Sequence, residues 1–484
     1  MDQTGMILKG KKVTVVGLAR SGVAVSNLLS SLGAKVIATD TKGPDELTGS
    51  IGRLERSVHL SLGGHPDIIF LEPDFIVVSP GVPMDIMPLN LARERGIPII
   101  SELELSYLIS DIPFIAITGT NGKSTTTTLV DLILGKAELK TILGGNIGKA
   151  LTEEIQKIVV SQQSSVNSQK TIDYGLSTVD YVVAEVSSFQ LEGIDTFRPK
   201  IASILNITSD HLDRYKSFND YTNAKARIFE NQKEGDFLVL NADDPETVRL
   251  CGSRLTGNNP DLPEVFFFSR KKAVEGVYLR DGIIYCNFPK LPLITCPLPL
   301  IDSDEIGIKG VHNLENAMAA TAIALLAGCN LGAIRETLAG FKGLEHRLEF
   351  VEEIRDVRFI NDSKGTNVGA LLKSLESLNS PVILIAGGLD KDSDFTPLRG
   401  AVTEKVKSLI LIGKAKDKIA EALNDCTEIS YASTMDDAVF LAFEKATAGS
   451  TILLSPACAS FDMFRDFEDR GRKFKEAVRR LKDA

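Results

Sequence analysis

The sequence has no tryptophan, only five histidines and six cysteines, and no two cysteines form a C-x-x-C pair. Histidines this scattered argue against a zinc site, and isolated cysteines predict reduced thiols rather than a disulfide framework. The longest apolar helical stretch, residues 317–329, is shorter than the about 20 residues that a bilayer span needs. The first residues lack a basic patch followed by an apolar run. We therefore expect no signal peptide and a cytoplasmic location.

Acidic residues outnumber basic ones, with 64 Asp and Glu against 54 Lys and Arg, and the formal net charge is −10 at pH 7. This balance argues against a protein that coats nucleic acid, although a nucleotide needs only a few local cations. The chain has 484 residues, of which 43% are hydrophobic and 24% charged. These values are typical of a soluble globular protein with ample core and about two to four domains.

The clearest pattern in the chain is a phosphate-binding loop within residues 114–128. The apolar run F-I-A-I-T predicts a strand, G-T-N-G-K-S-T follows, and a run of hydroxyl residues then opens a helical stretch. Glycine lets the backbone come close to a polyphosphate, and the helix dipole favours the anion by about 0.3–1 kcal/mol. Lys123 would supply a point charge and Ser124 a ligand for Mg²⁺.

This loop departs from the full G-x-x-x-x-G-K-[ST] pattern, because Ile117 stands five residues before Gly122 and the extra glycine is Gly119. A chance G-K-S without a phosphate role is the alternative interpretation. The strand before the loop and the helix after it favour the phosphate role.

The N-terminal part begins with a Rossmann-like unit. A β-branched strand over residues 12–17 leads into G-L-A-R-S-G and a helix, and a second strand ends in Asp40. Ala19 replaces the middle glycine of the dinucleotide fingerprint, so a nicotinamide site and a different ligand, such as a UDP group, both remain open. Another strand, residues 75–78, ends in S-P-G. The alternation of strands and helices predicts a parallel sheet.

Two further strands of the middle part end in candidate site residues. Residues 181–184 form a buried-type strand ending in Glu185, where a carboxylate associated with Mg²⁺ is expected downstream of a phosphate loop; a solvent-exposed glutamate is the alternative. The strand over residues 200–205 runs into N-I-T-S-D-H-L-D-R, which is typical of a site at the carboxyl end of a parallel sheet. Lys225 lies in a helical stretch, and taken alone it predicts a solvent-exposed lysine.

Two segments of the middle part predict irregular additions. Residues 161–178 are polar and predict a surface insertion, and residues 251–305 are β-rich with many prolines and predict a small antiparallel excursion. The last third then repeats the strand–helix rhythm after the linker G-L-E-H-R, and its strands lead into N-D-S-K-G-T-N, G-G-L-D-K and S-P-A-C-A-S-F-D. This pattern predicts a second nucleotide-type α/β sheet, in which Cys458 is a small buried residue rather than a nucleophile.

The ordered set of these motifs resembles the Mur ligases, ATP-dependent amide-forming enzymes of peptidoglycan synthesis. The resemblance rests on G-T-N-G-K-S-T, G-G-N-I-G, E-V-S-S-F-Q-L, N-I-T-S-D-H-L-D-R, K-A-R-I-F, H-N-L-E-N, E-H-R and N-D-S-K-G-T-N, and it covers nearly the whole chain. It implies an α/β fold in three domains: a Rossmann-like UDP-sugar-binding domain (1–111), a central ATP-binding domain with a P-loop ATPase-type parallel sheet and a small antiparallel part (112–343), and a Rossmann-like amino-acid-binding domain (344–484).

The C-terminal L-S-P-A-C-A-S-F-D-M-F-R-D-F-E-D-R-G and the N-terminal G-L-A-R-S-G resemble the family members that join D-glutamate to UDP-N-acetylmuramoyl-L-alanine. The resemblance implies that the substrate carboxylate is phosphorylated by ATP to an acyl phosphate, which the amine of D-glutamate then attacks. Two Mg²⁺ ions would assist. We expect a monomer that is not embedded in a membrane and binds no nucleic acid.

The resemblance also implies roles for individual residues. The catalytic residues would be Lys123, Asn146, Glu185, His211 and Lys225. The metal ligands would be Ser124, Glu185, His211 and Lys225, with Lys225 carbamylated. ATP would contact Gly119, Thr120, Asn121, Gly122, Lys123, Ser124, Thr125, Asn313, Asn316, Arg347 and Asp362. The UDP-sugar would contact Ser21, Asp40, Thr41, Lys42, Ser79, Pro80, Gly81, Asn146 and Ser187. D-glutamate would contact Lys364, Thr366, Lys391, Ser460 and Phe467.

Three other functions compete with this one. The first is a sister ligase that adds another amino acid, or a folylpolyglutamate synthase with the same ATP core. The second is a nicotinamide oxidoreductase, against which Ala19 and the phosphate loop argue. The third is a non-catalytic scaffold, which should have lost Lys123, Glu185, His211 or Lys225, whereas all four are present.

Overall fold

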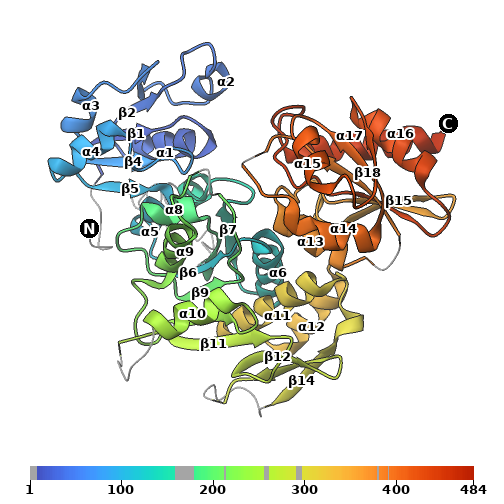
Figure 1. Ribbon diagram of the computed structural model, residues 1–484. Helices are drawn as coiled ribbons and strands as arrows, with labels where there is room; N and C mark the ends of the chain where they lie inside the picture. The colour runs from blue at the N-terminus through green and yellow to red at the C-terminus, as the bar shows by residue number, and fades with distance from the viewer. Residues whose placement is uncertain are drawn as a thin grey trace.

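The computed structural model describes residues 8–158, 179–211, 214–254, 261–289, 297–378, 381–390 and 392–483. It contains three sheets, each formed by a consecutive part of the chain. In Figure 1 these parts are blue, teal to yellow, and orange to red, and helices cover each sheet. The predicted three-unit α/β fold is confirmed. Within the described residues, no helix is long and apolar enough to cross a membrane.

The N-terminal sheet has five parallel strands in the order β3-β2-β1-β4-β5. The strand order reverses between β1 and β4, and a ligand is expected at the carboxyl ends of these two strands. The strands are β1 (Lys12–Val16), β2 (Lys35–Asp40), β3 (His59–Leu62), β4 (Phe75–Val78) and β5 (Ile99–Ser101). The helices are α1 (Arg20–Ser31), α2 (Thr48–Ile51), α3 (Ile68–Leu71), α4 (Met87–Glu94) and α5 (Glu102–Leu108).

Helix α5 joins the N-terminal sheet to the middle part through a fully buried carboxylate. Glu104 accepts hydrogen bonds from the backbone amides of Asp195, Thr196 and Phe197 at 2.9–3.0 Å and from the Thr196 hydroxyl at 2.6 Å. Because a buried carboxylate is tolerated only when it is well hydrogen-bonded, these four bonds fix α5 against that segment.

The central sheet has nine strands in the order β14-β13-β12-β11-β10-β9-β6-β8-β7. All five residues of β6 are buried, as expected for a parallel strand covered on both faces. The strands are β6 (Phe114–Thr118), β7 (Thr141–Gly145), β8 (Tyr181–Glu185), β9 (Ile201–Ile204), β10 (Phe237–Asn241), β11 (Glu264–Ser269), β12 (Gly276–Arg280), β13 (Ile283–Asn287) and β14 (Leu298–Asp302). The labelled helices are α6 (Lys123–Lys136), α8 (Ser188–Glu192), α9 (Phe218–Ala226), α10 (Pro245–Arg254), α11 (Val311–Leu326) and α12 (Leu331–Gly340), with 3₁₀ turns η1 (Arg227–Phe229) and η2 (Ser303–Glu305).

The β-rich segment predicted over residues 251–305 is only partly antiparallel. Strand β11 pairs in parallel with both β10 and β12, and only the pairs β12–β13 and β13–β14 are antiparallel. The segment therefore extends the central sheet instead of forming a separate excursion, and its first residues belong to α10. The predicted surface insertion, residues 161–178, lies outside the described residues.

The C-terminal sheet has six strands in the order β15-β16-β20-β17-β18-β19, parallel except for the edge pair β15–β16. The strands are β15 (Glu349–Ile354), β16 (Val357–Asn361), β17 (Val382–Gly387), β18 (Val406–Ile412), β19 (Glu428–Tyr431) and β20 (Thr451–Leu454). The helices are α13 (Val368–Glu376), α14 (Arg399–Lys405), α15 (Lys416–Leu423), α16 (Met435–Lys445) and α17 (Phe467–Asp483), with a 3₁₀ turn η3 (Thr396–Leu398). In Figure 1 this part lies beside α6 and α11 of the middle part.

Candidate active site

The phosphate loop connects β6 to α6 and needs glycine at two positions. Gly122 caps α6 with φ +84°, and a Cβ there would lie 2.2 Å from Oδ1 of Asn316. Gly119 has φ +157°, and a Cβ there would lie 3.1 Å from Cβ of Leu205. Only glycine can occupy position 122 without backbone strain or a clash. The shorter loop, with Ile117 in the preceding strand, is therefore a defined turn whose backbone geometry requires its glycines.

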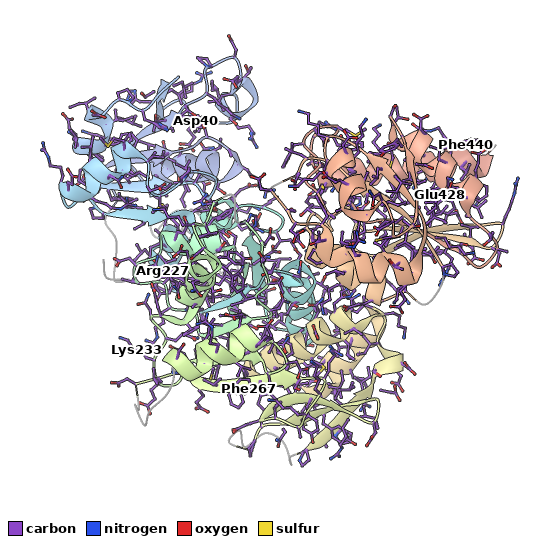
Figure 2. The ribbon with its side chains drawn as sticks, in the orientation of Figure 1. Asp40, Arg227, Lys233, Phe267, Glu428 and Phe440 are labelled. Carbon is purple, nitrogen blue, oxygen red and sulfur yellow. The ribbon has the colours of Figure 1, made fainter. Side chains whose placement is uncertain are left out.

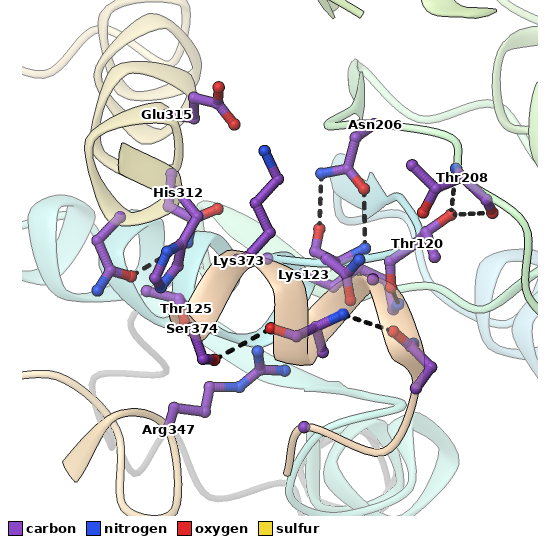
Figure 3. Close-up of a pocket in the computed structure, with 18 of the residues that line it drawn as sticks. Thr120, Lys123, Thr125, Asn206, Thr208, His312, Glu315, Arg347, Lys373 and Ser374 are labelled. Atoms are coloured by element: carbon purple, nitrogen blue, oxygen red, sulfur yellow. Dashed lines mark hydrogen bonds between the residues drawn. The ribbon is translucent and has the colours of Figure 1, made fainter. Parts of the chain in front are cut away.

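Residues after β9 fix the conformation of the loop (Figure 3). The Asn206 side chain accepts from the Asn121 amide at 2.9 Å and donates to the Asn121 carbonyl at 3.1 Å. The Thr120 hydroxyl accepts from the Thr208 amide at 3.0 Å and donates to the Thr208 carbonyl at 3.1 Å. These paired bonds leave the loop conformation set before any ligand binds.

Two lysines meet at one oxygen of the loop. Nζ of Lys123 and Nζ of Lys225 each donate to the Gly119 carbonyl at 2.8 Å. Burial holds the pKa of Lys225 well below its usual range, and the charge of Lys123 lowers that pKa further. Burial likewise lowers the pKa of Lys123, while Glu185 opposes this effect.

The sequence pattern around Lys225 predicts a solvent-exposed lysine, and this prediction is wrong. Lys225 is only 2% exposed, because its side of α9 packs on the phosphate loop and the Tyr221 ring, whose centroid lies 4.6 Å from Nζ. A lone lysine in a short helix carries no sequence signal of this contact, since the loop lies about a hundred residues earlier.

Glu185, at the end of β8, is buried, and the sequence-based alternative of an exposed glutamate is wrong. Its Oε1 accepts from Nδ2 of Asn146 at 2.8 Å. Its Oε2 is also buried and has no hydrogen-bond partner among the described residues. Burial alone would raise the pKa of Glu185, but Lys364 and Lys123 hold it below its usual range. Glu185 is therefore an ionised carboxylate with one free oxygen.

Two cationic side chains from the C-terminal part bind the hydroxyl of Ser124, the second residue of α6. Nη2 of Arg347 donates to Ser124 Oγ at 3.1 Å, and Nζ of Lys364 donates to it at 2.9 Å. Burial lowers the pKa of Lys364 to about 8, and Arg347 contributes to this shift. The long-range contacts bring residues more than 220 positions apart to the start of one helix.

Asp362 follows the last residue of β16 and interacts electrostatically with Arg347, one of these two cations. Its Oδ2 accepts from the hydroxyls of Ser374 and Ser455 at 2.7 and 2.8 Å. Burial raises the pKa of Asp362 to about 6, although the two hydroxyls and Arg347 oppose the shift. Asp362 therefore anchors the loop after β16 and lies close enough to act on Arg347.

These groups line a cavity of about 530 Å³ between the central and C-terminal parts. In Figure 3, His312 and Glu315 extend from α11 on one side, and Lys373 and Arg347 come from the C-terminal part on the other. Three buried atoms of lining residues lack a hydrogen-bond partner among the described residues: Glu185 Oε2, His312 Nδ1 and Arg347 Nε. Unpaired buried polar atoms are costly, so their convergence on one cavity indicates a polar ligand.

The structure brings most of the predicted ATP residues and several others into this cavity. The predicted site residues that line it are Thr120, Asn121, Gly122, Lys123, Thr125, Asn146, Glu185, His211, Asn313, Asn316, Arg347, Asp362, Lys364, Thr366 and Phe467. Ser124 is buried beneath Arg347 and Lys364. Burial lowers the pKa of His312 to about 4, so this imidazole is neutral near pH 7.

The predicted UDP-sugar residues gather instead at the strand ends of the N-terminal sheet. Asp40, labelled in Figure 2, accepts from the amides of Leu18 and Lys42 at 2.8 and 3.0 Å. The Ser79 hydroxyl donates to the Gly17 carbonyl at 2.9 Å. The remaining members of this group are Ser21, Thr41, Pro80 and Gly81. They follow the carboxyl ends of the strands, the edge at which a ligand is expected in such a sheet.

Among the described residues, Gly119 and Lys225 of the phosphate-loop region do not line the cavity, and neither do Ser187 and Ser460. Ser187 caps α8, where its hydroxyl accepts from the Gln190 amide at 3.3 Å. Ser460 is buried in the loop after β20. Lys391 lies outside the described residues.

Sequence reasoning missed Arg214 as a connection between the two sites. Its guanidinium donates to the carbonyls of Pro80 and Val82 at 3.1 and 3.2 Å, pairs with Glu192 at 2.6 Å, and lies 4.2 Å from the centroid of the Phe189 ring. The loop after β4 is thereby tied to the segment that contains His211. The motif N-I-T-S-D-H-L-D-R contains Arg214, but the sequence gives no sign that this side chain contacts the loop after β4.

Comparison with protein families gives three matches in chain order. Residues 11–101 match "Mur ligase MurD-like, N-terminal domain", residues 117–324 match "Mur ligase middle domain", and residues 346–458 match "Mur ligase, glutamate ligase domain". Together they span most of the chain and include each of the three sheets in turn.

Individual relatives match over nearly the full length. The chain is 47% identical to the UDP-N-acetylmuramoylalanine–D-glutamate ligase of Geotalea daltonii, over 98% of this chain and 99% of that protein. It is 46% identical to the enzyme of the same name from Pelotomaculum thermopropionicum, over 98% of each chain. Among solved structures, a pseudomurein peptide ligase type C from Methanothermus fervidus aligns with a TM-score of 0.59 at 18% identity, covering 98% of this chain and 100% of that one. UDP-N-acetylmuramate–alanine ligase MurC from Thermotoga maritima aligns with a TM-score of 0.57 at 19% identity, with the same coverage.

Proposed function

Because the chain belongs to the Mur ligase family, we propose that it joins D-glutamate to UDP-N-acetylmuramoyl-L-alanine, with conversion of ATP to ADP and phosphate, in peptidoglycan precursor synthesis. Relatives named for this reaction match nearly the whole chain at 43–47% identity. The structural observation that carries the proposal is the meeting of Lys123, Arg347 and Lys364 around the start of α6, beside an ionised Glu185.

The chemistry requires several anions to come together. The terminal carboxylate of the UDP-sugar attacks the γ-phosphorus of ATP, and ADP leaves, so an acyl phosphate forms. The amine of D-glutamate attacks the acyl carbon, loses a proton, and inorganic phosphate departs. A carboxylate alone is a poor acylating agent, and phosphorylation supplies the leaving group. Lys123 and Arg347 offset the negative charge that develops on the transferred phosphoryl group.

The residues present fit a bound Mg²⁺. Glu185 offers a buried oxygen without a hydrogen-bond partner, and a hard cation of this kind prefers oxygen ligands. The Ser124 hydroxyl, which accepts hydrogen bonds from Arg347 and Lys364, would become a ligand once these two side chains turn to bound substrates. His211 lines the same cavity and would serve a second ion. When bound, Mg²⁺ would neutralise charge on the phosphate oxygens.

Lys225 fits carbamylation, because the group that reacts with CO₂ is a neutral amine. Its burial and the neighbouring Lys123 favour the neutral form. The amine nitrogen bonds to the carbon of CO₂ and releases one proton, and the product is an anionic carbamate. This change would place an anion beside the Lys123 cation near the Gly119 carbonyl, and it would supply further oxygen ligands for Mg²⁺.

The three sheets suggest three domains with separate substrates. We assign residues 1–111 to the UDP-sugar, residues 112–343 to ATP, and residues 344–484 to D-glutamate, in agreement with the positions of the family matches. Arg214 would link the first two sites, and Lys364, Thr366 and Phe467 would face the third substrate from the C-terminal domain.

One assay tests the proposed reaction. Phosphate release by the full-length protein should require ATP, UDP-N-acetylmuramoyl-L-alanine and D-glutamate together. Release that L-glutamate or another amino acid supports equally well would contradict the assignment and favour a sister ligase. Oxidation of a nicotinamide cofactor in place of phosphate release would favour the oxidoreductase.

Gly122→Ala is expected to weaken ATP binding at least about 10-fold. The added Cβ would lie 2.2 Å from Asn316 Oδ1, at a φ of +84° that disfavours side chains, so the loop must shift. Isothermal titration with a non-hydrolysable ATP analogue measures the effect. Gly135→Ala, on the same helix with nothing within 4 Å of the added Cβ, is the matched control and should bind like the wild type.

A further inference from the structure

The largest fully buried side chain of the described residues belongs to Arg470, on α17, which none of the predicted roles includes. Its Nε donates to the Ser363 hydroxyl at 3.0 Å, and Nη2 donates to the Ser363 carbonyl at 2.8 Å. Its Nη1 donates to the carbonyls of Cys458 and Ala459 at 3.1 and 3.3 Å. All four of these acceptors are uncharged, so none of the bonds is an ion pair.

Each segment that Arg470 touches continues into a residue that the family resemblance predicts to contact D-glutamate. Ser363 precedes Lys364 in the loop after β16, and Cys458 and Ala459 precede Ser460 in the loop after β20. The Ser363 hydroxyl also donates to the carbonyl of Phe467, the first residue of α17, at 2.8 Å. One guanidinium therefore fixes the relative positions of three chain segments at one end of the C-terminal sheet.

Backbone contacts between the same loops support this arrangement in addition to the bonds of Arg470. The Ala457 amide donates to the Gly365 carbonyl at 2.9 Å, which joins the two loops a second time. Ala459 pairs with Leu389 in the loop after β17. A Cβ on Gly388 would lie 2.2 Å from the Ala459 carbonyl and 3.2 Å from Nη1 of Arg470, so the loops are closely packed around the guanidinium.

Burying a guanidinium is costly unless well-placed hydrogen bonds compensate for the loss of its hydration. Burial lowers the pKa of Arg470 to about 10, so the group stays charged near pH 7. Its planar fork of five donors can span acceptors on separate segments, which the ammonium of lysine cannot do. A core that needed only stability would be served better by an apolar side chain.

We propose that Arg470 is the positioning residue of the D-glutamate site, which sets the mutual placement of Lys364, Ser460 and Phe467 through their backbones. The proposal rests on the proposed function. It assigns Arg470 no contact with the substrate, and its effect should fall on the incoming amino acid and spare the phosphorylation of the UDP-sugar.

The test uses Arg470→Lys in the full-length protein. The KM for D-glutamate should rise at least about 20-fold, because small displacements of binding groups are costly, while the KM values for ATP and UDP-sugar change less than about twofold. Acyl-phosphate formation without D-glutamate, trapped as a hydroxamate with hydroxylamine, should stay near the wild-type rate. Equal rises in all three KM values, or an unchanged KM for D-glutamate, would overturn the proposal.

A milder variant covers the case in which Arg470→Lys does not fold. Ser363→Ala removes the acceptor of Arg470 Nε and the donor to Phe467, and it should raise the KM for D-glutamate about 3- to 10-fold. An unchanged KM here would equally overturn the proposal. Arg480→Lys is the matched control, because Arg480 lies on the same helix, is 57% exposed and pairs with Asp436. If the wild type uses another amino acid, the proposed function fails, and the same comparison made with that amino acid still tests Arg470.

Discussion

Lys225→Ala should lower kcat by at least about 1,000-fold, with little loss of stability relative to the wild type. The substitution removes the nitrogen that would carry the carbamate, and with it a proposed anionic ligand of Mg²⁺. Burial and the neighbouring Lys123 lower the pKa of the wild-type amine, so truncation removes a buried polar group that is costly to charge. Phosphate release with all three substrates gives kcat, and thermal unfolding gives the change in stability.

Short carboxylates distinguish a carbamate from a simple structural lysine. Formate or acetate can enter the space that the side chain vacates and supply the missing oxygens, so each should restore part of the activity of Lys225→Ala. Lys225→Arg should stay inactive and should not respond, because its guanidinium fills that space and does not form a carbamate. Lys233→Ala, at the surface in Figure 2, should behave like the wild type. Turnover of Lys225→Ala near the wild-type rate would remove the carbamate role.

Glu185→Gln is expected to reduce kcat by about 100-fold or more and to raise the Mg²⁺ concentration needed for half-maximal rate. The amide keeps the size of the side chain and can still accept from Asn146 at the position of Oε1. It loses the negative charge that interacts with Lys123 and Lys364, and it places a donor or a neutral oxygen at the position of the buried, unpartnered Oε2. A Mg²⁺ titration of phosphate release measures both changes.

The Mg²⁺ dependence separates a ligand from a residue that only orders the loop. Asn146→Ala removes the hydrogen bond to Oε1 but leaves the carboxylate, so it should lower kcat while changing the Mg²⁺ requirement less than Glu185→Gln does. Glu234→Gln, an exposed residue of the same domain, is the control for the charge change. A Glu185→Gln protein with a wild-type Mg²⁺ requirement would contradict the role as a ligand.

The fold could be predicted because its signals are local. Apolar runs such as residues 114–118 are buried on both faces of a parallel sheet, and glycine-rich turns or polar motifs follow them at the strand ends. The segment 251–305 was harder, because short strands interrupted by prolines do not reveal whether their neighbours run parallel or antiparallel. Pairing of β11 with β10 depends on where α10 returns the chain.

The candidate site could be predicted only where it coincides with a motif. Lys123, Glu185 and Asp362 stand at strand or helix ends, where polar residues attract attention. Lys225, Arg214 and Arg470 gain their roles from partners more than 100 positions away, and no spacing in the sequence records such contacts. The resemblance to the family pointed to Lys225 in advance, and the structure adds its burial beside Lys123, which the sequence does not reveal.

The bonds of Arg470 also bear on how amino-acid specificity changes during evolution. Three of its four acceptors are main-chain carbonyl oxygens, which every residue type carries. Side chains in the loops after β16 and β20 can therefore be exchanged one at a time while the loops keep their framework. Substitutions in these loops could therefore change which amino acid is bound while the fold of the C-terminal domain is retained.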